Sequence, residues 1–380
     1  MVIRRLKAED YDDLLTVLNR AFNNPDFTKV LPRMWVRSDE YMGKHIGAFE
    51  DGQLCAVVGI YPLPVVIGDV RLKFATTGNV ATLPEYEGRG YFRTLFTKAM
   101  EILEQEGYDA ARLGGDRRRY ARYGYEPCGQ LYKFAFTGAE RRSYFDNAYE
   151  SVELVQLQAT DTRWLTFTRE LANSKRFYVE RYGNDAERDV YRTMCGKKCT
   201  PYIALRAGEP IGYLCVNDGG RYIFEMRAYN TEDFMQILCA WQAKMGERVT
   251  VAVAPYMTGE VAALADCAYD VSVVSPSRFK ILRWDRVCDS LMKLAYATRK
   301  MPEGEFCLQI QDYGMLRFFV NATGAGCVRE ESPEAALTLP ASKAAPFLFG
   351  PFQPSMTVPE RPELNAWFPL PLSWNVLDYV

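Results

Sequence analysis

A glycine-rich turn that opens a helix is the first place in this sequence where chemistry can be located. Residues 79–93 read NVATLPEYEGRGYFR, in which a strand ends at a proline and Gly88 and Gly90 precede an amphipathic helix. The first backbone amides of a helix have no partner within it and lie at the positive end of its dipole, so such a turn can hold an anion. Glycine lets a pyrophosphate approach the backbone, and Arg89 and Arg93 add positive charge. The glycines alone fit an ordinary strand-to-helix turn equally well.

The segment YARYGY contains Tyr120 and Tyr125. An ordinary tyrosine has a pKa of about 10, so such a residue can act as a proton donor. A packing role is the alternative in a chain that has 24 tyrosines. The basic residues 117–119 and Arg122 fit either a solvated face or a site for phosphate groups.

The single histidine, His45, excludes several kinds of site. A metal site with two histidine ligands cannot exist, and a Ser-His or Cys-His pair could use only this residue. His45 begins an expected strand, which indicates a structural role. The ten cysteines are scattered and contain no CxxC pair, which favours buried thiols; a disulfide framework or a zinc site is the alternative. We therefore expect no metal.

Composition limits the partners and the location. The net charge of −2 gives no reason to expect nucleic acid, and no apolar run is long enough to span a bilayer. The N-terminal residues turn acidic where a signal peptide would become apolar, which predicts a cytoplasmic location and no membrane partner. At 380 residues the chain exceeds one ordinary hydrophobic core, so several domains are expected.

The order of elements predicts an α/β (α+β) protein of three parts. Residues 1–148 alternate strands and helices around the glycine turn, with helices over 8–23 and 88–105 and strands over 45–49, 54–61, 65–67 and 70–83. Residues 149–283 repeat this order more loosely and lack the glycine-rich element after the fourth strand. Residues 284–380 begin with a helix over 286–299, continue with short strands and end in a tail rich in proline and aromatic residues.

The turn and the tyrosine together resemble the GNAT (Gcn5-related) N-acetyltransferases. Their acyl-coenzyme A signature, Q/R-x-x-G-x-G/A, aligns with residues 87–92; Gly90 fits, whereas Glu87 and Phe92 depart from the pattern. The resemblance implies acetyl-CoA as co-substrate, and Tyr120 as the acid that protonates the departing thiolate. It places the co-substrate on Val80, Ala81, Thr82, Glu87, Gly88, Arg89, Gly90, Tyr91, Phe92 and Arg93.

The three-part order resembles the Eis (enhanced intracellular survival) family. That layout is a catalytic GNAT domain (1–148), a degenerate GNAT-like domain (149–283) and a domain similar to sterol carrier proteins (284–380). The family implies that the C-terminal carboxylate, here that of Val380, reaches back to the first domain as the base. The apolar tail suits a docked terminus, or it merely completes the third part. Phe22, Asp26 and Trp35 lie where the acceptor pocket is walled, although packing or capping would also explain each of them.

These observations predict an N-acetyltransferase that acts on the primary amine of an aminoglycoside, a polyamine or a lysine-like peptide. The off-pattern Glu87 and Phe92 keep an alternative open. In that alternative the protein binds a lipid or another hydrophobic ligand, and its first domain is vestigial. A homo-oligomer, in the family a hexamer, is also expected, with the aromatic tail as one way to build it.

Overall fold

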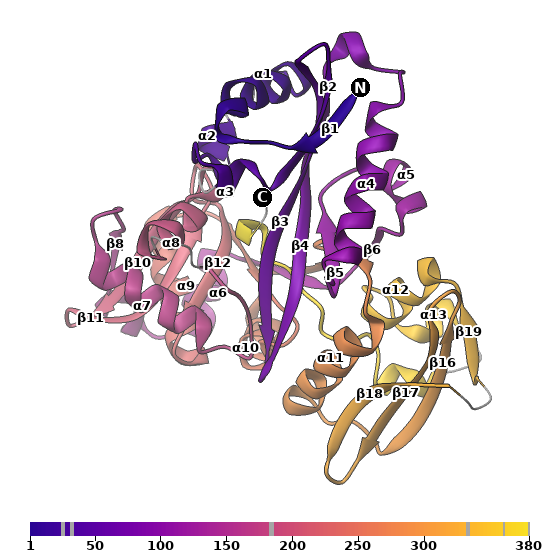
Figure 1. The fold of residues 1–380 in the computed structure, drawn as a ribbon. Coiled ribbons are helices and arrows are strands. Elements are labelled where there is room, and N and C mark those ends of the chain that lie inside the picture. Colours follow the sequence, from indigo (N-terminus) through magenta and orange to yellow (C-terminus); the bar gives the residue numbers. More distant parts are fainter. Residues whose placement is uncertain (24–26, 31–33, 182–185, 332–334, 360–361, 379–380) are drawn as a thin grey trace.

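The computed structural model describes residues 1–23, 27–30, 34–181, 186–331, 335–359 and 362–378. These residues form three β-sheets, each with its own helices (Figure 1). The expected mixed α/β architecture is confirmed.

The first sheet positions the glycine turn. Its strand order is β1-β2-β3-β4-β5-β15-β6, with β9 paired to β3. The strands are β1 Val2–Arg5, β2 His45–Glu50, β3 Gln53–Ile67, β4 Val70–Thr82, β5 Ala110–Leu113, β15 Ser277–Ile281, β6 Glu126–Cys128 and β9 Phe177–Val179. The helices are α1 Tyr11–Ala21, α2 Phe27–Val30, α3 Asp39–Met42, α4 Tyr91–Gln105 and α5 Arg117–Tyr120.

Helices α1 and α4 cover opposite faces of this sheet. Successive residues of a strand point to opposite faces, so Val57 of β3 packs in the core under α1, whereas Val58 packs in the core under α4. Helix α4 buries Leu95, Phe96, Ala99, Met100 and Leu103, which recur at helical spacing on one face. This apolar stripe fixes how α4 lies on the sheet, and therefore where its N-terminus is.

The second sheet has the order β14-β7-β13-β12-β11-β10-β8. Its strands are β7 Leu131–Phe136, β8 Val152–Gln156, β10 Thr200–Arg206, β11 Glu209–Val216, β12 Tyr222–Ala228, β13 Val249–Val253 and β14 Asp270–Val274. Its helices are α6 Gly138–Tyr144, α7 Thr162–Asn173, α8 Ala186–Met194, α9 Thr231–Met245 and α10 Thr258–Cys267. Helix α9 starts directly after β12 with Asn230 as its N-cap and has no glycine turn, as the sequence pattern predicts.

The first two sheets exchange a strand. β15, from residues 277–281, lies between β5 and β6 of the first sheet, and β7, from residues 131–136, lies between β13 and β14 of the second. The two sheets therefore have the same topology, each completed by a strand from the other half of the chain. The division at 148/149 stays a prediction, and backbone hydrogen bonds cross it in both directions.

The third sheet has the order β18-β17-β16-β19 and carries helices α11, α12 and α13. Its elements are α11 Trp284–Thr298, β16 Gly304–Ile310, β17 Gly314–Asn321, β18 Gly324–Glu330, β19 Leu337–Leu339, α12 Ala341–Phe349 and α13 Pro354–Thr357. One continuous core joins Leu308 and Phe318 of this sheet to Leu63 and Phe74 of the first. The third part is thus packed tightly on the lower end of β3 and β4 (Figure 1).

Two expected boundaries are wrong. The strands expected over 54–61 and 65–67 form one strand, β3, in spite of Pro62 and Pro64. Proline has no N–H to donate, and these prolines lie in the interval where β3 has finished pairing with β2 and has not yet met β9. The helix expected from residue 88 starts at Tyr91, because Gly88 and Gly90 have positive φ angles of 75° and 85°.

Candidate active site

Strands β4 and β5 diverge at the centre of the first sheet. They pair in parallel only from Phe74 to Thr76 of β4, opposite Ala110 to Arg112. On its other side β4 stays paired with β3 as far as Thr82. The β5-facing edge of β4 beyond Thr76 therefore has no partner in β5, and its backbone groups are available to a ligand that enters the divergence.

A β-bulge at Asn79 shapes this edge. The register between β3 and β4 shifts after Val57, and Asn79 has a φ of 48°. The Asn79 amide donates to the hydroxyl of Tyr61 at 2.5 Å, and that hydroxyl lies 2.7 Å from Nε2 of His45. Burial lowers the pKa of His45 to about 4, so the ring is neutral at pH 7. Nδ1 lies 3.2 Å from the Met42 carbonyl, which can only accept, so Nδ1 carries the proton and Nε2 accepts from Tyr61. His45 is thus a buried structural residue, as its type and position predicted.

The glycine turn leaves open space above the N-terminus of α4. A Cβ built on Gly88 or on Gly90 would meet no atom within 4 Å. Gly90 is the N-cap, no side chain caps the helix, and its first turn contains no acidic residue. The leading amides of a 15-residue helix therefore face this space without a competing carboxylate from the helix itself. Such an arrangement suits a phosphate group.

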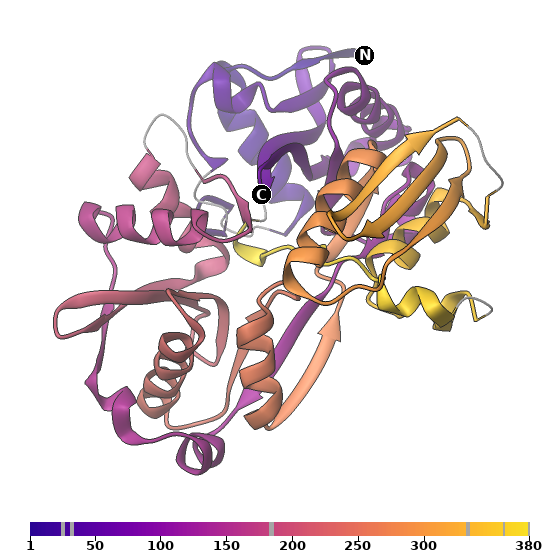
Figure 2. The same ribbon diagram turned by 90° about the horizontal axis from the view of Figure 1, so that it is seen from below.

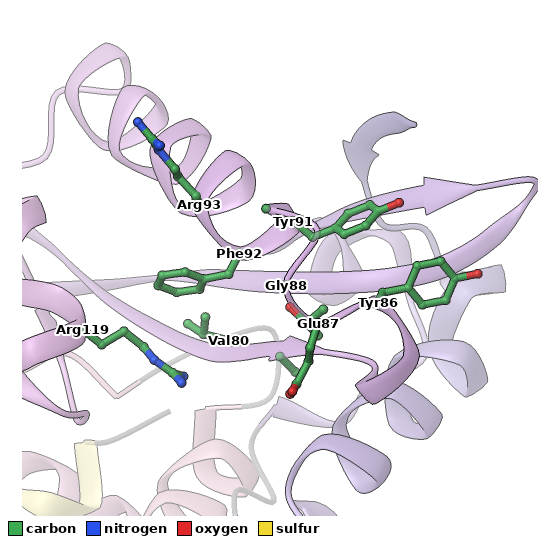
Figure 3. Close-up of a pocket in the computed structure, with 11 residues that line it drawn as sticks. Val80, Tyr86, Glu87, Gly88, Tyr91, Phe92, Arg93 and Arg119 are labelled. Atoms are coloured by element: carbon green, nitrogen blue, oxygen red, sulfur yellow. The ribbon is translucent and has the colours of Figure 1, made fainter.

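A cavity of about 440 Å³ lies between the open edge of β4 and this helix end (Figure 3). It includes nine of the ten residues expected to bind the co-substrate; Arg89 is the exception. The lining residues are Val80, Ala81, Thr82, Tyr86, Glu87, Gly88, Gly90, Tyr91, Phe92, Arg93 and Arg119. Tyr86, from the turn before the glycines, was not expected at the site.

The charges around the cavity are mixed. Arg89 turns away, 3.7 Å from the Glu50 carboxylate, and the Tyr91 hydroxyl donates to the same carboxylate, so the rings of Tyr86 and Tyr91 point away from Phe92 (Figure 3). Arg119 reaches the cavity and lies over the Phe92 ring at 5.5 Å. Glu87 also lines it and opposes an anion there.

The three arginines of α5 make different contacts. Arg117 pairs with Glu126 at 2.8 Å and Arg118 pairs with Asp116 at 2.8 Å, whereas Arg119 is the member that lines the cavity. The sequence left open whether this run is a solvated face or a phosphate site, and each description fits part of it.

Tyr120 lies behind the Phe92 wall rather than on the cavity lining. Its ring centroid is 6.0 Å from that of Phe92 and 5.1 Å from that of Phe96, and 7 % of the residue is exposed. Burial raises the pKa of Tyr120 above its ordinary value, although the charge of Arg119 acts in the opposite direction. The group is therefore protonated at neutral pH, as a proton donor must be.

The partner tyrosine of the motif connects this turn to β4. The Tyr125 hydroxyl is fully buried and lies 2.8 Å from the Thr77 hydroxyl. Thr77 is the first residue of β4 beyond its pairing with β5. Tyr125 thus attaches the Tyr120 turn to the point where the two strands diverge.

The expected acceptor residues form an aromatic cluster near α2. Phe22 packs edge-on against Phe27, with centroids 5.4 Å apart, and the Trp35 indole donates to the Phe27 carbonyl at 2.6 Å. Neither Phe22 nor Trp35 lines the cavity beside α4. Asp26 and Val380 lie outside the described residues, so their expected roles stay predictions.

Among the described residues, no group of three His, Cys, Asp or Glu side chains could hold a metal ion. No helix within the described ranges is long and apolar enough to cross a membrane. All ten cysteines are free thiols.

Comparisons with known proteins agree with this geometry. Residues 2–128 match the profile of the acetyltransferase (GNAT) domain. A GCN5-related N-acetyltransferase from Kribbella flavida superposes with a TM-score of 0.68 at 18% identity, covering 100% of this chain and 98% of that one. Eis1 from Mycobacterium abscessus superposes with a TM-score of 0.66 at 14% identity, covering 99% and 98%.

A GCN5-related N-acetyltransferase from Anabaena variabilis gives 0.66 at 16% identity and covers both chains completely. At these identities the superpositions establish the fold over the whole chain. No curated protein matches the sequence significantly. The matched residues 2–128 include every residue that lines the cavity, so the similarity to the acetyltransferase (GNAT) domain covers the candidate site.

Proposed function

We propose that the protein transfers the acetyl group of acetyl-CoA to a primary amine, and that the cavity beside α4 holds the co-substrate. The observation that carries the proposal is the open β4 edge that leads to an uncapped helix N-terminus over two glycines. The edge would bind the pantetheine amides, and the helix amides with Arg93 and Arg119 would bind the pyrophosphate. Acetyl-CoA supplies the activated acyl group.

Tyr120 is the proposed acid. Proton transfer from a tyrosine of ordinary pKa, about 10, to a thiolate with a pKa near that of cysteine is uphill by roughly 2 kcal/mol. Burial raises the pKa of Tyr120 and adds to this cost, which positioning in a dry site would offset. Its ring packs against Phe92, a residue of the cavity wall, so a bound co-substrate that displaced Phe92 would expose Tyr120 to the cavity.

The terminal carboxylate of Val380 is the proposed base. Asp378, two positions before it, is the last described residue and is 3 % exposed. A tail whose end is held this firmly suits a placed terminus better than a frayed one. A cationic acceptor would enter along the aromatic cluster of Phe22, Phe27 and Trp35, which favours cations.

The acceptor class is an aminoglycoside, a polyamine or a lysine-bearing peptide. The test is release of free CoA from acetyl-CoA with kanamycin, spermidine and a lysine tetrapeptide as probes. Tyr120→Phe should lower kcat at least 100-fold at unchanged KM for acetyl-CoA. Tyr123→Phe, in the same turn and packed on the same Phe96, is the matched control and should stay within twofold of wild type. No thiol release with any probe would refute the proposal.

One observation favours the alternative of hydrophobic-ligand binding. A cavity of about 610 Å³ lies between α12, α13 and β6, with Phe347, Phe352 and Met356 among its lining residues. A bound lipid in native mass spectra, together with no binding of acetyl-CoA, would replace the first proposal by this one.

An oligomer is proposed from the edge of the second sheet. Val271 and Val273 of the edge strand β14 are 54 % and 46 % exposed, and an uncovered apolar edge strand is a site for association. Sedimentation of a monomer at micromolar concentration would contradict this.

A further inference from the structure

The second sheet contains a divergence equivalent to the cofactor groove of the first. β12 and β13 are parallel neighbours that pair only at Tyr222 and Ile223 of β12, opposite Thr250 and Val251. Beyond Ile223, the β13-facing edge of β12 is open, as the β5-facing edge of β4 is open beyond Thr76. The two sheets thus present the same kind of opening at the same place in their topology.

The C-terminal segment of the chain occupies this second opening. A cavity of about 180 Å³ there is walled by β12, by β13 and by Ser373, Trp374, Asn375 and Val376. The Asn375 amide donates to the Phe224 carbonyl of β12 at 3.1 Å. The tail thus makes, on β12, the kind of backbone contact that the co-substrate is proposed to make on β4.

The tail contacts the first sheet as well. The Trp374 indole stacks on Phe74 of β4 with centroids 6.0 Å apart and ring planes 2° from parallel, and its ring lies 6.1 Å from that of Phe279 in β15. The backbone N–H of Gln130, which lies between β6 and β7, donates to the Leu372 carbonyl at 2.8 Å. In two perpendicular views the yellow tail runs between the two sheets (Figures 1 and 2).

A buried ionic cluster holds the end of this tail. We call Arg181, Glu225, Asp378 and Tyr213 the Arg181 cluster. Arg181 donates to both oxygens of Glu225 at 2.8 and 2.6 Å, and to both oxygens of Asp378 at 2.8 and 2.9 Å. The Tyr213 hydroxyl donates to Glu225 at 2.5 Å. One guanidinium therefore joins β12 to the tail by two bidentate contacts.

The Arg181 cluster contributes more to the position of the tail than to the stability of the fold. Arg181, Glu225 and Asp378 are 8 %, 1 % and 3 % exposed, and the desolvation cost of buried ion pairs largely offsets their attraction. The apolar contacts of Val376 and Leu377 are not directional, so they specify the register of the tail less sharply than the ion pairs do. A shift of the tail along the chain would leave a buried charge without its partner, so the ions fix which tail residue lies at this point.

The held end lies next to the acceptor side of the first domain. The turn η8 (Val376–Asp378) packs against η6 (Gly196–Lys198), and η6 packs against α2. Phe27 of α2 belongs to the aromatic cluster with Phe22 and Trp35. The turn that contains Asp378 is therefore separated only by η6 from α2 and the proposed acceptor site.

We propose that the groove of the second sheet binds the chain's own C-terminal segment. In this proposal Arg181 is a positioning residue: it fixes the register of that segment and thereby the place of the terminus at the proposed active site. The inference rests on the proposed role of the Val380 carboxylate as base. Arg181 touches neither substrate nor reacting atoms; it acts through Asp378. The second GNAT-like fold thereby serves the first site and binds no acyl-CoA of its own.

The main variant is Arg181→Lys. Lysine keeps the charge but cannot form the two bidentate contacts, which limits the damage to the fold. Arg221→Lys is the matched control, because Arg221 forms an exposed ion pair with Glu247 at 2.6 Å elsewhere in the same sheet. Asp378→Asn is the second variant; it leaves the Arg181–Glu225 pair intact and releases the tail alone.

The first readout is independent of activity and follows trimming by carboxypeptidase Y in intact-mass spectra. In wild type and in R221K, trimming should stop at Asp378. In R181K and D378N it should pass Asp378 at least ten times faster than in wild type. Equal trimming of wild type and R181K would overturn the proposal.

The second readout is kinetic, with acetyl-CoA and the best amine probe. R181K should lower kcat about ten- to a hundredfold, at unchanged KM for acetyl-CoA, and so should a chain that ends at Asp378. If the shortened chain kept the wild-type kcat, the terminal carboxylate would not be the base, and the inference would be refuted. If R181K kept the wild-type kcat while the shortened chain was impaired, the carboxylate base would stand and only the positioning role of Arg181 would be refuted.

Discussion

Gly90→Glu separates co-substrate binding from backbone strain. Gly90 has a φ of 85°, where a side chain costs about 1–2 kcal/mol. A Cβ there meets no atom within 4 Å, so no clash adds to this cost. The new carboxylate would stand at the helix N-terminus where the pyrophosphate is proposed to bind, and would repel it.

Gly208→Glu is the control, because it adds the same charge at the same kind of position. Gly208 has a φ of 82° in the turn between β10 and β11, and its Cβ would also meet no atom within 4 Å. Both variants should therefore lose a similar amount of stability without ligand, on the order of 1 kcal/mol. Only the Gly90 variant should change how the protein responds to acetyl-CoA.

The assay is the thermal midpoint with and without acetyl-CoA. At a concentration 100 times its Kd, a ligand that binds only the folded state adds about 2.7 kcal/mol, so wild type and G208E should both show a clear rise. G90E should show none. An equal rise in G90E would refute the placement of the co-substrate on the glycine turn, and the absence of a rise in wild type would refute acetyl-CoA binding altogether.

The remaining predictions concern pH. The pKa of His45 is lowered to about 4 by burial, so the folded state loses stability as pH falls below the unfolded-state value near 6.5. Urea unfolding should show a loss of about 2 kcal/mol between pH 7 and pH 5 that His45→Gln lacks; parallel curves would contradict this. Burial alone would raise the pKa of Glu225, but the charge and hydrogen bonds of Arg181 lower it to about 2. Glu225→Gln should therefore cost roughly 3 kcal/mol at pH 7, and its difference from wild type should shrink as pH falls from 4.5 toward 2; a constant difference would argue against the ionic role.

The parts of the site that lie on one continuous segment could be predicted from the sequence. The glycine turn, α4 and the β4 edge fall within residues 70–105, and local signals define them: two glycines, a preceding proline and an apolar stripe at helical spacing. The same signals predicted the helix-initiating turn of α9 without glycine. The bulge at Asn79 carried a weaker signal, the pair Gly78-Asn79, because asparagine tolerates a positive φ better than most residues.

The strand exchange could not be predicted in this way. Strands β7 and β15 each carry apolar residues that suit a buried position in either sheet, and a strand's own pattern does not name its neighbour. The Arg181 cluster is equally non-local, since Arg181 is 44 residues from Glu225 and 197 residues from Asp378. Single charged residues in such positions look like ordinary surface residues until the fold brings them together.

The exchanged strand makes the catalytic domain depend on the rest of the chain. Without β15, both β5 and β6 would lack the neighbour between them. Phe279 of β15 is fully buried in the core that also holds Phe74 and Trp374, and Arg112 of β5, 1 % exposed, donates to Ser277 at 3.0 Å. The same strand therefore supplies the sheet, the buried polar partner of β5 and a wall for the tail. β15 follows β14, the edge strand of the second sheet, in the chain, and pairs with β5, the strand from which β4 diverges. The sheet that carries the proposed active site is thus completed by a strand from the second half of the chain.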